Sequence, residues 1–208
     1  ELGLVGSEMC IRDRDRIDGF SGESERRAPA DLDDFPEYKE KIAKSGGTPT
    51  YTRPCCTNEL KVKDETSLLQ DINNFKNSLD KLNHRHAFMN SASPGVINVF
   101  MPNKFYSTED EYLDKLSNIM AKEYELITKS DIQVQLDCPD LALARHMNFK
   151  NLSEDEFIKR AELQIECLNS ALSNVDVEQT RMHICWGNYE GPHTHDTVSY
   201  THLRAHET

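Results

Sequence analysis

The stretch IQVQLD, residues 132–137, alternates apolar and polar side chains, which is typical of a β-strand with one face against a core. It lies between two segments, over 107–127 and 153–172, in which apolar residues recur every three or four positions, as in amphipathic helices. Another helix is expected over 66–82, and further strands at 86–92 and 180–185. Helices and strands therefore alternate, and the sequence predicts an α/β fold with a parallel sheet.

The three helices are predicted from their apolar stripes and from capping residues. Ser107 with Asp110, and Ser153 with Glu156, form S-x-x-D and S-x-x-E signals at the starts of the second and third helices. The stripes are Leu69, Ile72, Phe75, Leu79 and Leu82 in the first helix, Tyr112, Leu113, Leu116, Ile119, Met120, Tyr124 and Ile127 in the second, and Phe157, Ala161, Ile165, Leu168 and Leu172 in the third. We interpret all three stripes as core packing.

An alternating α/β chain forms either a doubly wound sheet or a closed eight-stranded barrel. No expected strand is followed by a G-x-G-x-x-G or P-loop motif, so a nucleotide-binding doubly wound sheet lacks its usual signature. The sequence therefore favours a (β/α)8 TIM barrel.

Charge and composition exclude several classes of partner. The chain has 208 residues and a formal net charge of −12, whereas nucleic-acid sites need clustered Lys and Arg. The basic clusters at 12–16 and at Arg26-Arg27 are short and flanked by acids, and we interpret them as solvated surface. No apolar run is long enough to span a membrane, so no membrane partner and a cytoplasmic location are expected. The six cysteines, including the adjacent Cys55 and Cys56, are expected to be reduced thiols.

The two ends of the chain do not continue the pattern of the middle. Residues 3–14 read GLVGSEMCIRDR and residues 198–208 read VSYTHLRAHET, without helical or strand periodicity. Both stretches resemble peptides translated from sequencing-adapter DNA. We therefore expect 1–14 and 198–208 to be artefactual or disordered extensions, and 15–197 to be one partial domain.

One expected strand carries a candidate half of a metal site. His183 and Cys185 stand at positions i and i+2, so both side chains leave the same face, about 6–7 Å apart along the strand. Imidazole and thiolate are zinc's usual protein ligands. Asp137 ends its own strand, and active-site groups of barrels lie at the carboxyl ends of strands.

Four segments of the chain resemble segments of the catalytic domain of cobalamin-independent methionine synthase. They follow one another along this chain in the same order as in that family. They are His183-Ile-Cys185-Trp-Gly-Asn-Tyr-Glu-Gly-Pro-His193, Gln135-Leu-Asp137-Cys-Pro-Asp-Leu-Ala, Gly22-Glu23-Ser-Glu-Arg26 and Ser91-Ala-Ser-Pro-Gly95. The resemblance implies an incomplete TIM barrel that lacks its first and last strands. It also implies a Zn²⁺-dependent methyltransferase that moves a methyl group from a methylfolate donor to the thiol of homocysteine, which yields methionine.

The resemblance also assigns roles to residues. His183 and Cys185 match the zinc ligands, and the two further ligands, a Glu and a Cys, are expected beyond the end of this chain. Glu23 and Asp137 match the acids that hold the amino-acid part of homocysteine. His193 and His195 are interpreted as loop residues near the site mouth, and His84 and His86 as structural. A fragment with two of four ligands is expected to be inactive by itself.

Two departures from the family leave the methyl donor open. The synthases read Asp-Glu-Pro-Ala-Leu where this chain has Asp-Cys-Pro-Asp-Leu at 137–141, and their folate-contacting Arg-Cys is replaced near Pro54-Cys55, with Arg53 close by. A related zinc-thiol alkyltransferase, similar to the epoxide-opening coenzyme M transferases, is therefore a second hypothesis for the reaction.

Two more hypotheses place the chain in different protein classes. A metal-free barrel similar to uroporphyrinogen decarboxylase would bring Arg26, Arg27 and Arg53 to one pocket. A truncated, inactive barrel would expose sheet edges and associate.

Overall fold

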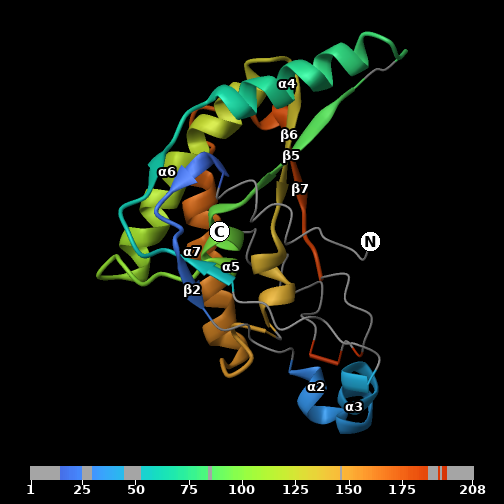
Figure 1. Ribbon diagram of the computed structural model, residues 1–208, viewed down its shortest axis with the longest axis vertical. Helices are drawn as coiled ribbons and strands as arrows, with labels where there is room; N and C mark the ends of the chain where they lie inside the picture. The colour runs from blue at the N-terminus through green and yellow to red at the C-terminus, as the bar shows by residue number, and fades with distance from the viewer. Residues whose placement is uncertain are drawn as a thin grey trace.

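A computed structural model describes residues 15–24, 30–44, 53–83, 86–145, 147–186, 192 and 194–195. Its centre is a parallel sheet of three strands, β5 (Phe88–Ala92), β6 (Gln133–Asp137) and β7 (Thr180–His183), in the order β5-β6-β7 (Figure 1). The predicted parallel pairing of these three segments is confirmed. The described residues contain three strands of this sheet, so an incomplete TIM barrel stays a prediction.

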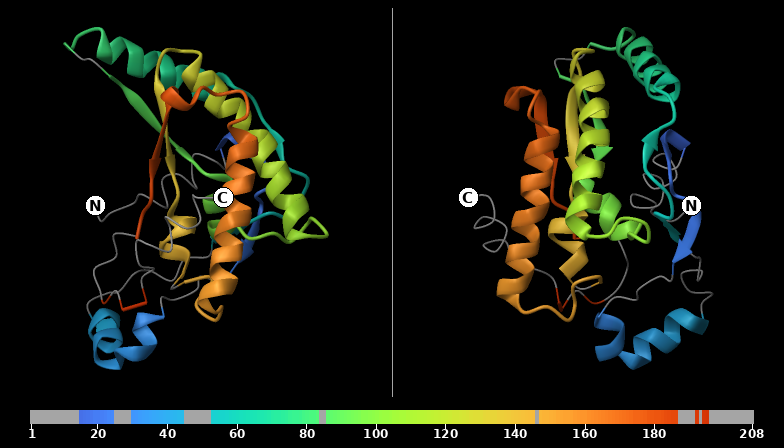
Figure 2. Two further views of the ribbon diagram at one scale, coloured as in Figure 1. Left: turned by 180° about the vertical axis from the view of Figure 1, so that it is seen from behind. Right: turned by 90° about the vertical axis from the view of Figure 1, so that its left-hand side faces the viewer.

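Helices α6 (Glu109–Thr128) and α7 (Glu154–Ala171) run side by side and cover one face of the sheet (Figure 2). The short helix α5 (Pro94–Phe100) follows β5 and packs against both. Val134 and Leu136 of β6 point into this layer and are buried. Every residue of the predicted second stripe is buried, and so are Phe157, Ala161 and Leu168 of the third, as expected for core packing.

The start of α7 is confirmed, and the start of α6 is corrected by one residue. Ser153 caps α7 and forms a capping box with Glu156. In α6 the capping hydroxyl belongs to Thr108, which accepts from the Glu111 amide at 3.1 Å, and not to Ser107. Thr108-x-x-Glu111 offers the same pattern as Ser107-x-x-Asp110, so the sequence contains two overlapping signals.

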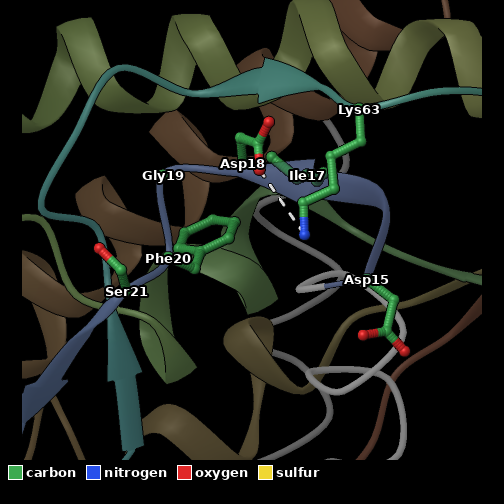
Figure 3. Close-up of a pocket in the computed structure, with 7 residues that line it drawn as sticks. All are labelled: Asp15, Ile17, Asp18, Gly19, Phe20, Ser21 and Lys63. Atoms are coloured by element: carbon green, nitrogen blue, oxygen red, sulfur yellow. Dashed lines mark ion pairs between the residues drawn. The ribbon is translucent and has the colours of Figure 1, made fainter.

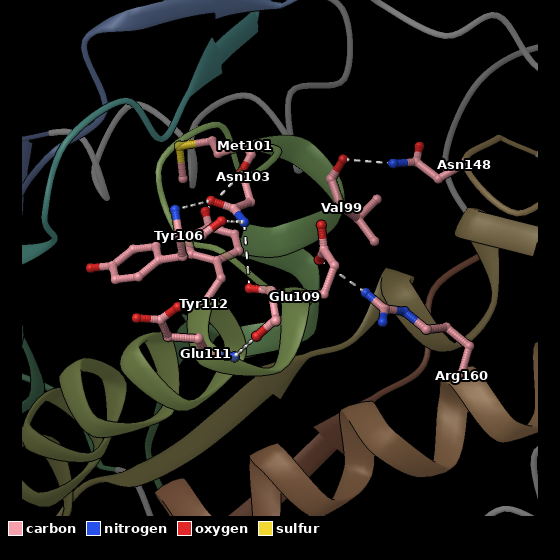
Figure 4. Close-up of polar contacts among 10 residues, drawn as sticks. Val99, Met101, Asn103, Tyr106, Glu109, Glu111, Tyr112, Asn148 and Arg160 are labelled. Atoms are coloured by element: carbon pink, nitrogen blue, oxygen red, sulfur yellow. Dashed lines mark hydrogen bonds and ion pairs between the residues drawn. The ribbon is translucent and has the colours of Figure 1, made fainter.

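Polar contacts hold the helix ends together (Figure 4). Arg160 of α7 pairs with Glu109 at the start of α6 at 3.3 Å, and Asn148 Nδ2 donates to the Val99 carbonyl of α5 at 2.9 Å. The hydroxyl of the buried Tyr112 donates to the Met101 carbonyl at 2.6 Å. These bonds connect α5, α6 and α7 into one unit.

Helix α4 (Thr66–Leu79) lies at one end of the molecule, opposite the short helices α2 (Asp31–Asp34) and α3 (Pro36–Lys44) (Figure 1). Its predicted stripe is wrong in part. Leu68 and Ile72 are buried, whereas Leu69 is 42% exposed and Leu82 is 64% exposed, beyond the end of the helix. The contact face of α4 is narrower than the apolar pattern indicates.

Among the described residues, four short strands lie outside the parallel sheet. β1 (Ile17–Asp18) pairs with β4 (Lys61–Val62), and β2 (Gly22–Ser24) pairs with β3 (Arg53–Cys55), both antiparallel. Three 3₁₀ turns complete the described elements: η1 (Pro139–Leu141), η2 (Leu143–Arg145) and η3 (Val177–Gln179).

Arg16 corrects the interpretation of the cluster at 12–16 as solvated surface. Its side chain is 9% exposed and pairs with Asp71 of α4 at 2.6 Å and with Glu123 of α6 at 3.1 Å. Glu123 also accepts from the hydroxyl of Ser91 in β5 at 2.7 Å. Arg16 is therefore a buried connection between α4 and α6.

The expected extensions at 1–14 and 198–208, and Arg26 and Arg27, lie outside the described residues.

Candidate metal site

Three of the four residues expected at the site, Asp137, His183 and Cys185, lie where two neighbouring strands end. In the parallel ladder Asp137 stands opposite His183, with Ala92 of β5 on the other side of Asp137. Side chains of directly opposed residues in a parallel pair leave the same face of the sheet. The register therefore places the Asp137 carboxylate beside the His183 ring, and Cys185 two residues further along.

The three side chains converge, and two of them are in contact. Asp137 Oδ1 and His183 Nδ1 are 2.6 Å apart, and one potential ligand atom from each of Asp137, His183 and Cys185 lies within 4.8 Å of the other two. Ligand atoms of one tetrahedral zinc are roughly 3.3–3.8 Å apart, given bond lengths of about 2.0 Å to nitrogen and 2.3 Å to sulfur. The imidazole and the thiol are donors of the kinds that zinc prefers, and their separation of at most 4.8 Å is within reach of one ion.

Backbone hydrogen bonds fix all three residues. The Ser93 amide donates to the Asp137 carbonyl at 3.2 Å, the Cys138 amide to the His183 carbonyl at 2.9 Å, and the Leu143 amide to the Cys185 carbonyl at 3.2 Å. The Cys138 bond continues the alignment of β6 and β7 past the ends of the strands, and the Leu143 bond connects Cys185 to η2. The side chains at 183 and 185 thus leave a backbone that is held in place.

A buried polar contact lies behind the strand ends. The Ser93 hydroxyl caps α5 by accepting from the Val96 amide at 3.0 Å, and it donates to Asp140 Oδ1 at 2.7 Å. Burial raises the pKa of Asp140 to about 7, opposed by the hydrogen bond from Ser93. Burial also raises the pKa of the Cys138 thiol well above its ordinary value. Cys138 therefore remains a neutral thiol, unlike a metal ligand.

The electrostatics of Asp137 have two opposing causes. Burial raises the pKa of its carboxyl group, while the charge and the hydrogen bond of His183 lower it. The Asp137 side chain is 4% exposed and the His183 side chain is 47% exposed. The acid is thus the inner partner, and the ring is the outer one.

The same face of the sheet is polar toward the other ends of the strands. Gln135 Nε2 donates to Asn90 Oδ1 at 2.9 Å, and the Arg181 guanidinium lies 3.9 Å from the centre of the Phe88 ring. Arg181 precedes His183 by two residues, so both side chains leave this face.

Glu23 is not part of the group. It lies on β2, which pairs with β3 apart from the parallel sheet (Figure 1), and its side chain is exposed. Its backbone carbonyl accepts from Lys104 Nζ at 2.8 Å. Among the described residues, the potential ligands that come together are Asp137, His183 and Cys185.

The remaining candidate residues are engaged elsewhere or undescribed. His195 bonds to Asp34, and Thr194 donates to Asp31 at 2.6 Å from its hydroxyl and 2.7 Å from its amide, so both contact α2. His193 and His84 lie outside the described residues. Arg53, expected at the pocket of a decarboxylase-like barrel, is buried with its guanidinium 4.7 Å from the centre of the Phe100 ring.

A cavity of about 260 Å³ lies near the start of the described chain, away from these residues (Figure 3). Asp18 and Lys63 form an ion pair of 3.6 Å at its wall. Its other lining residues are Asp15, Ile17, Gly19, Phe20 and Ser21. None of Asp137, His183 and Cys185 lines it, so this cavity is separate from the candidate metal site.

None of the five described cysteines forms a disulfide with another described residue, and Cys185 is the partly exposed one. No helix within the described part of the chain is long and apolar enough to cross a membrane.

Comparison of the chain with models of protein families, with curated proteins and with solved structures finds no match in any of the three.

Proposed function

We propose that this chain carries half of a zinc site that activates a thiol for alkyl transfer. The reaction that the sequence resemblance implies is transfer of a methyl group from a methylfolate donor to the sulfur of homocysteine. The observation that supports the proposal best is the convergence of Asp137, His183 and Cys185 at the ends of β6 and β7.

His183 and Cys185 would hold the ion. Their two atoms are of the kinds that zinc prefers, and backbone hydrogen bonds hold both residues, His183 at the end of β7 and Cys185 two residues beyond it. When bound, zinc lowers the pKa of a coordinated thiol and so maintains a nucleophilic sulfur at neutral pH. The resemblance supplies the remaining ligands, a Glu and a Cys, from later strands.

The acids would orient the acceptor. By the same resemblance, Asp137 and Glu23 would attract the ammonium group of homocysteine. Asp137 lies beside the ligands, whereas Glu23 is on a separate pair of strands. We therefore give the larger share of this role to Asp137.

Cobalt substitution of the 208-residue chain tests the proposal, because a thiolate bound to Co²⁺ gives charge-transfer absorption in the near ultraviolet. We expect this absorption in the wild type and a further increase when homocysteine adds its own sulfur. Cys185→Ser and His183→Ala should each remove most of the wild-type band.

Cys167→Ser is the matched control, since Cys167 is a buried thiol on α7 outside the group. It should keep the absorption. A wild-type chain without a metal-dependent band, or a band that persists in Cys185→Ser, would contradict the proposal.

A further inference from the structure

We infer that Asp137 is a positioning residue, which fixes the His183 ring so that Nε2 is the nitrogen presented beside Cys185 Sγ. This role is separate from any contact with a substrate. It rests on the proposed function in so far as Nε2 is taken to be the metal ligand. The observation behind it is the 2.6 Å contact between Asp137 Oδ1 and His183 Nδ1.

The chemistry of the two groups determines where the proton sits. An ionised carboxylate can only accept hydrogen bonds, so Nδ1 must donate. A neutral imidazole carries one proton, and with that proton on Nδ1 the lone pair is on Nε2. The contact therefore selects the tautomer of His183 that can bind a metal through Nε2.

The burial of the pair makes Asp137 the fixed partner. Its side chain is 4% exposed, and its backbone lies between two strands with partners Ala92 and His183. The Ser93 amide also holds its carbonyl. The carboxylate has little room to follow a moving ring, so the ring must adopt the orientation that the carboxylate sets.

The exposed side of His183 is the side available to a ligand. Its side chain is 47% exposed, although Nδ1 is bonded to a buried acid. The Cys138 amide fixes the carbonyl of the same residue at 2.9 Å, so the backbone cannot turn the ring away. The edge of the ring opposite Asp137 is thus directed outward in a defined orientation.

Such an outer partner alters metal affinity without touching the metal. A carboxylate that accepts from a ligating histidine orients the ring and raises its basicity, and its loss typically costs about 10–100-fold in affinity. Asp137→Ala should therefore weaken Co²⁺ and Zn²⁺ binding by roughly that factor. At saturating Co²⁺ the d–d bands should keep their intensity, because the number of ligands is unchanged.

The tautomer can be read without any metal. In ¹⁵N-labelled, metal-free chain at a pH where the ring is neutral, the ring-nitrogen shifts of His183, assigned with His183→Gln, should show the proton on Nδ1. In Asp137→Ala the proton should move toward Nε2, which is the usual site in water-exposed histidines. Asp176→Ala is the matched control, because Asp176 bonds the Glu178 amide just before β7 and should leave the shifts unchanged.

The outcomes separate the two proposals. If the wild type binds no metal, the proposed function fails, while the nitrogen shifts still decide the role of Asp137. An Nδ1 proton that persists in Asp137→Ala overturns the inference, and so does a loss of d–d intensity at saturating Co²⁺, which would make Asp137 a direct ligand. Asp137→Leu has about the same size and offers no acceptor, so it is the second variant should Asp137→Ala not fold; it should change shifts and affinity in the same direction.

Discussion

Replacing Gly95 by alanine tests how tightly the polar contact behind the strand ends is packed. A Cβ on Gly95 would lie 2.2 Å from Asp140 Oδ2, 2.7 Å from Asp140 Cγ and 3.2 Å from Gln164 Cγ. Real Cβ atoms do not approach so closely, so Asp140 would have to move. It is held there by the Ser93 hydroxyl at 2.7 Å, and both residues are buried.

The expected change in the free energy of unfolding of Gly95→Ala is the sum of opposing contributions. Alanine in place of glycine inside a helix stabilises by about 1 kcal/mol. Overpacking of a buried site costs about 1–3 kcal/mol, and loss of a hydrogen bond costs about 1 kcal/mol more. The net destabilisation of Gly95→Ala should be about 2 kcal/mol, which lowers the Tm of a chain of this length by roughly 4–8 °C.

Thermal and urea unfolding followed by circular dichroism measures this loss. The matched background is Asp140→Ala, in which the carboxylate is absent and the new methyl group has room. There Gly95→Ala should cost at least about 1 kcal/mol less, as a double-mutant cycle would show. The reasoning is refuted if Gly95→Ala stabilises the wild-type chain, or if its cost is equal in both backgrounds.

Three further changes probe different buried groups. The pKa of Asp140 is raised from 3.8 to about 7, so between these pH values the folded state retains a proton that the unfolded state releases. The stability of the wild type should therefore fall as pH rises from about 4 to about 7. Asp140→Asn should flatten this slope in urea midpoints measured over that range. Tyr124→Phe removes the hydroxyl that donates to the Ala92 carbonyl at 2.6 Å, and calorimetry should show a loss of about 1–2 kcal/mol; an unchanged Tm would mean that this bond contributes nothing. Arg16→Met leaves Glu123, 14% exposed, without its cation, and chemical unfolding should show a loss of about 3 kcal/mol, whereas a loss below about 0.5 kcal/mol would indicate a pair that behaves as if solvated.

The strongest periodic patterns of the sequence were enough to predict the centre of the fold. β6 alternates cleanly and α6 and α7 carry long apolar stripes, so their existence and order follow from local sequence. Helix α5 has no such signal, since all seven of its residues are buried and no polar face marks the period. The strands outside the parallel sheet have two or three residues, too few to show alternation.

The features of the candidate metal site that depend on local sequence could be predicted. The predicted strand over 180–185 ends at His183, so Cys185 lies two residues beyond it, yet the two side chains still converge as the spacing indicates. The shared carboxyl end of parallel strands brings Asp137 near them. The direct bond between Asp137 and His183 depends on the register of β6 against β7, which is a tertiary property. Arg16 shows the same limit, because its partners Asp71 and Glu123 are distant in sequence.

The position of β7 in the described sheet affects how a metal shell could be completed. Within the described residues β7 pairs on one side with β6, and its other side is an edge. A strand added there would run about 4.8 Å away. Its side chains at the level of residues 183 and 185 would lie beside the imidazole and the sulfur, so such a strand is one place from which a further donor of the proposed site would come.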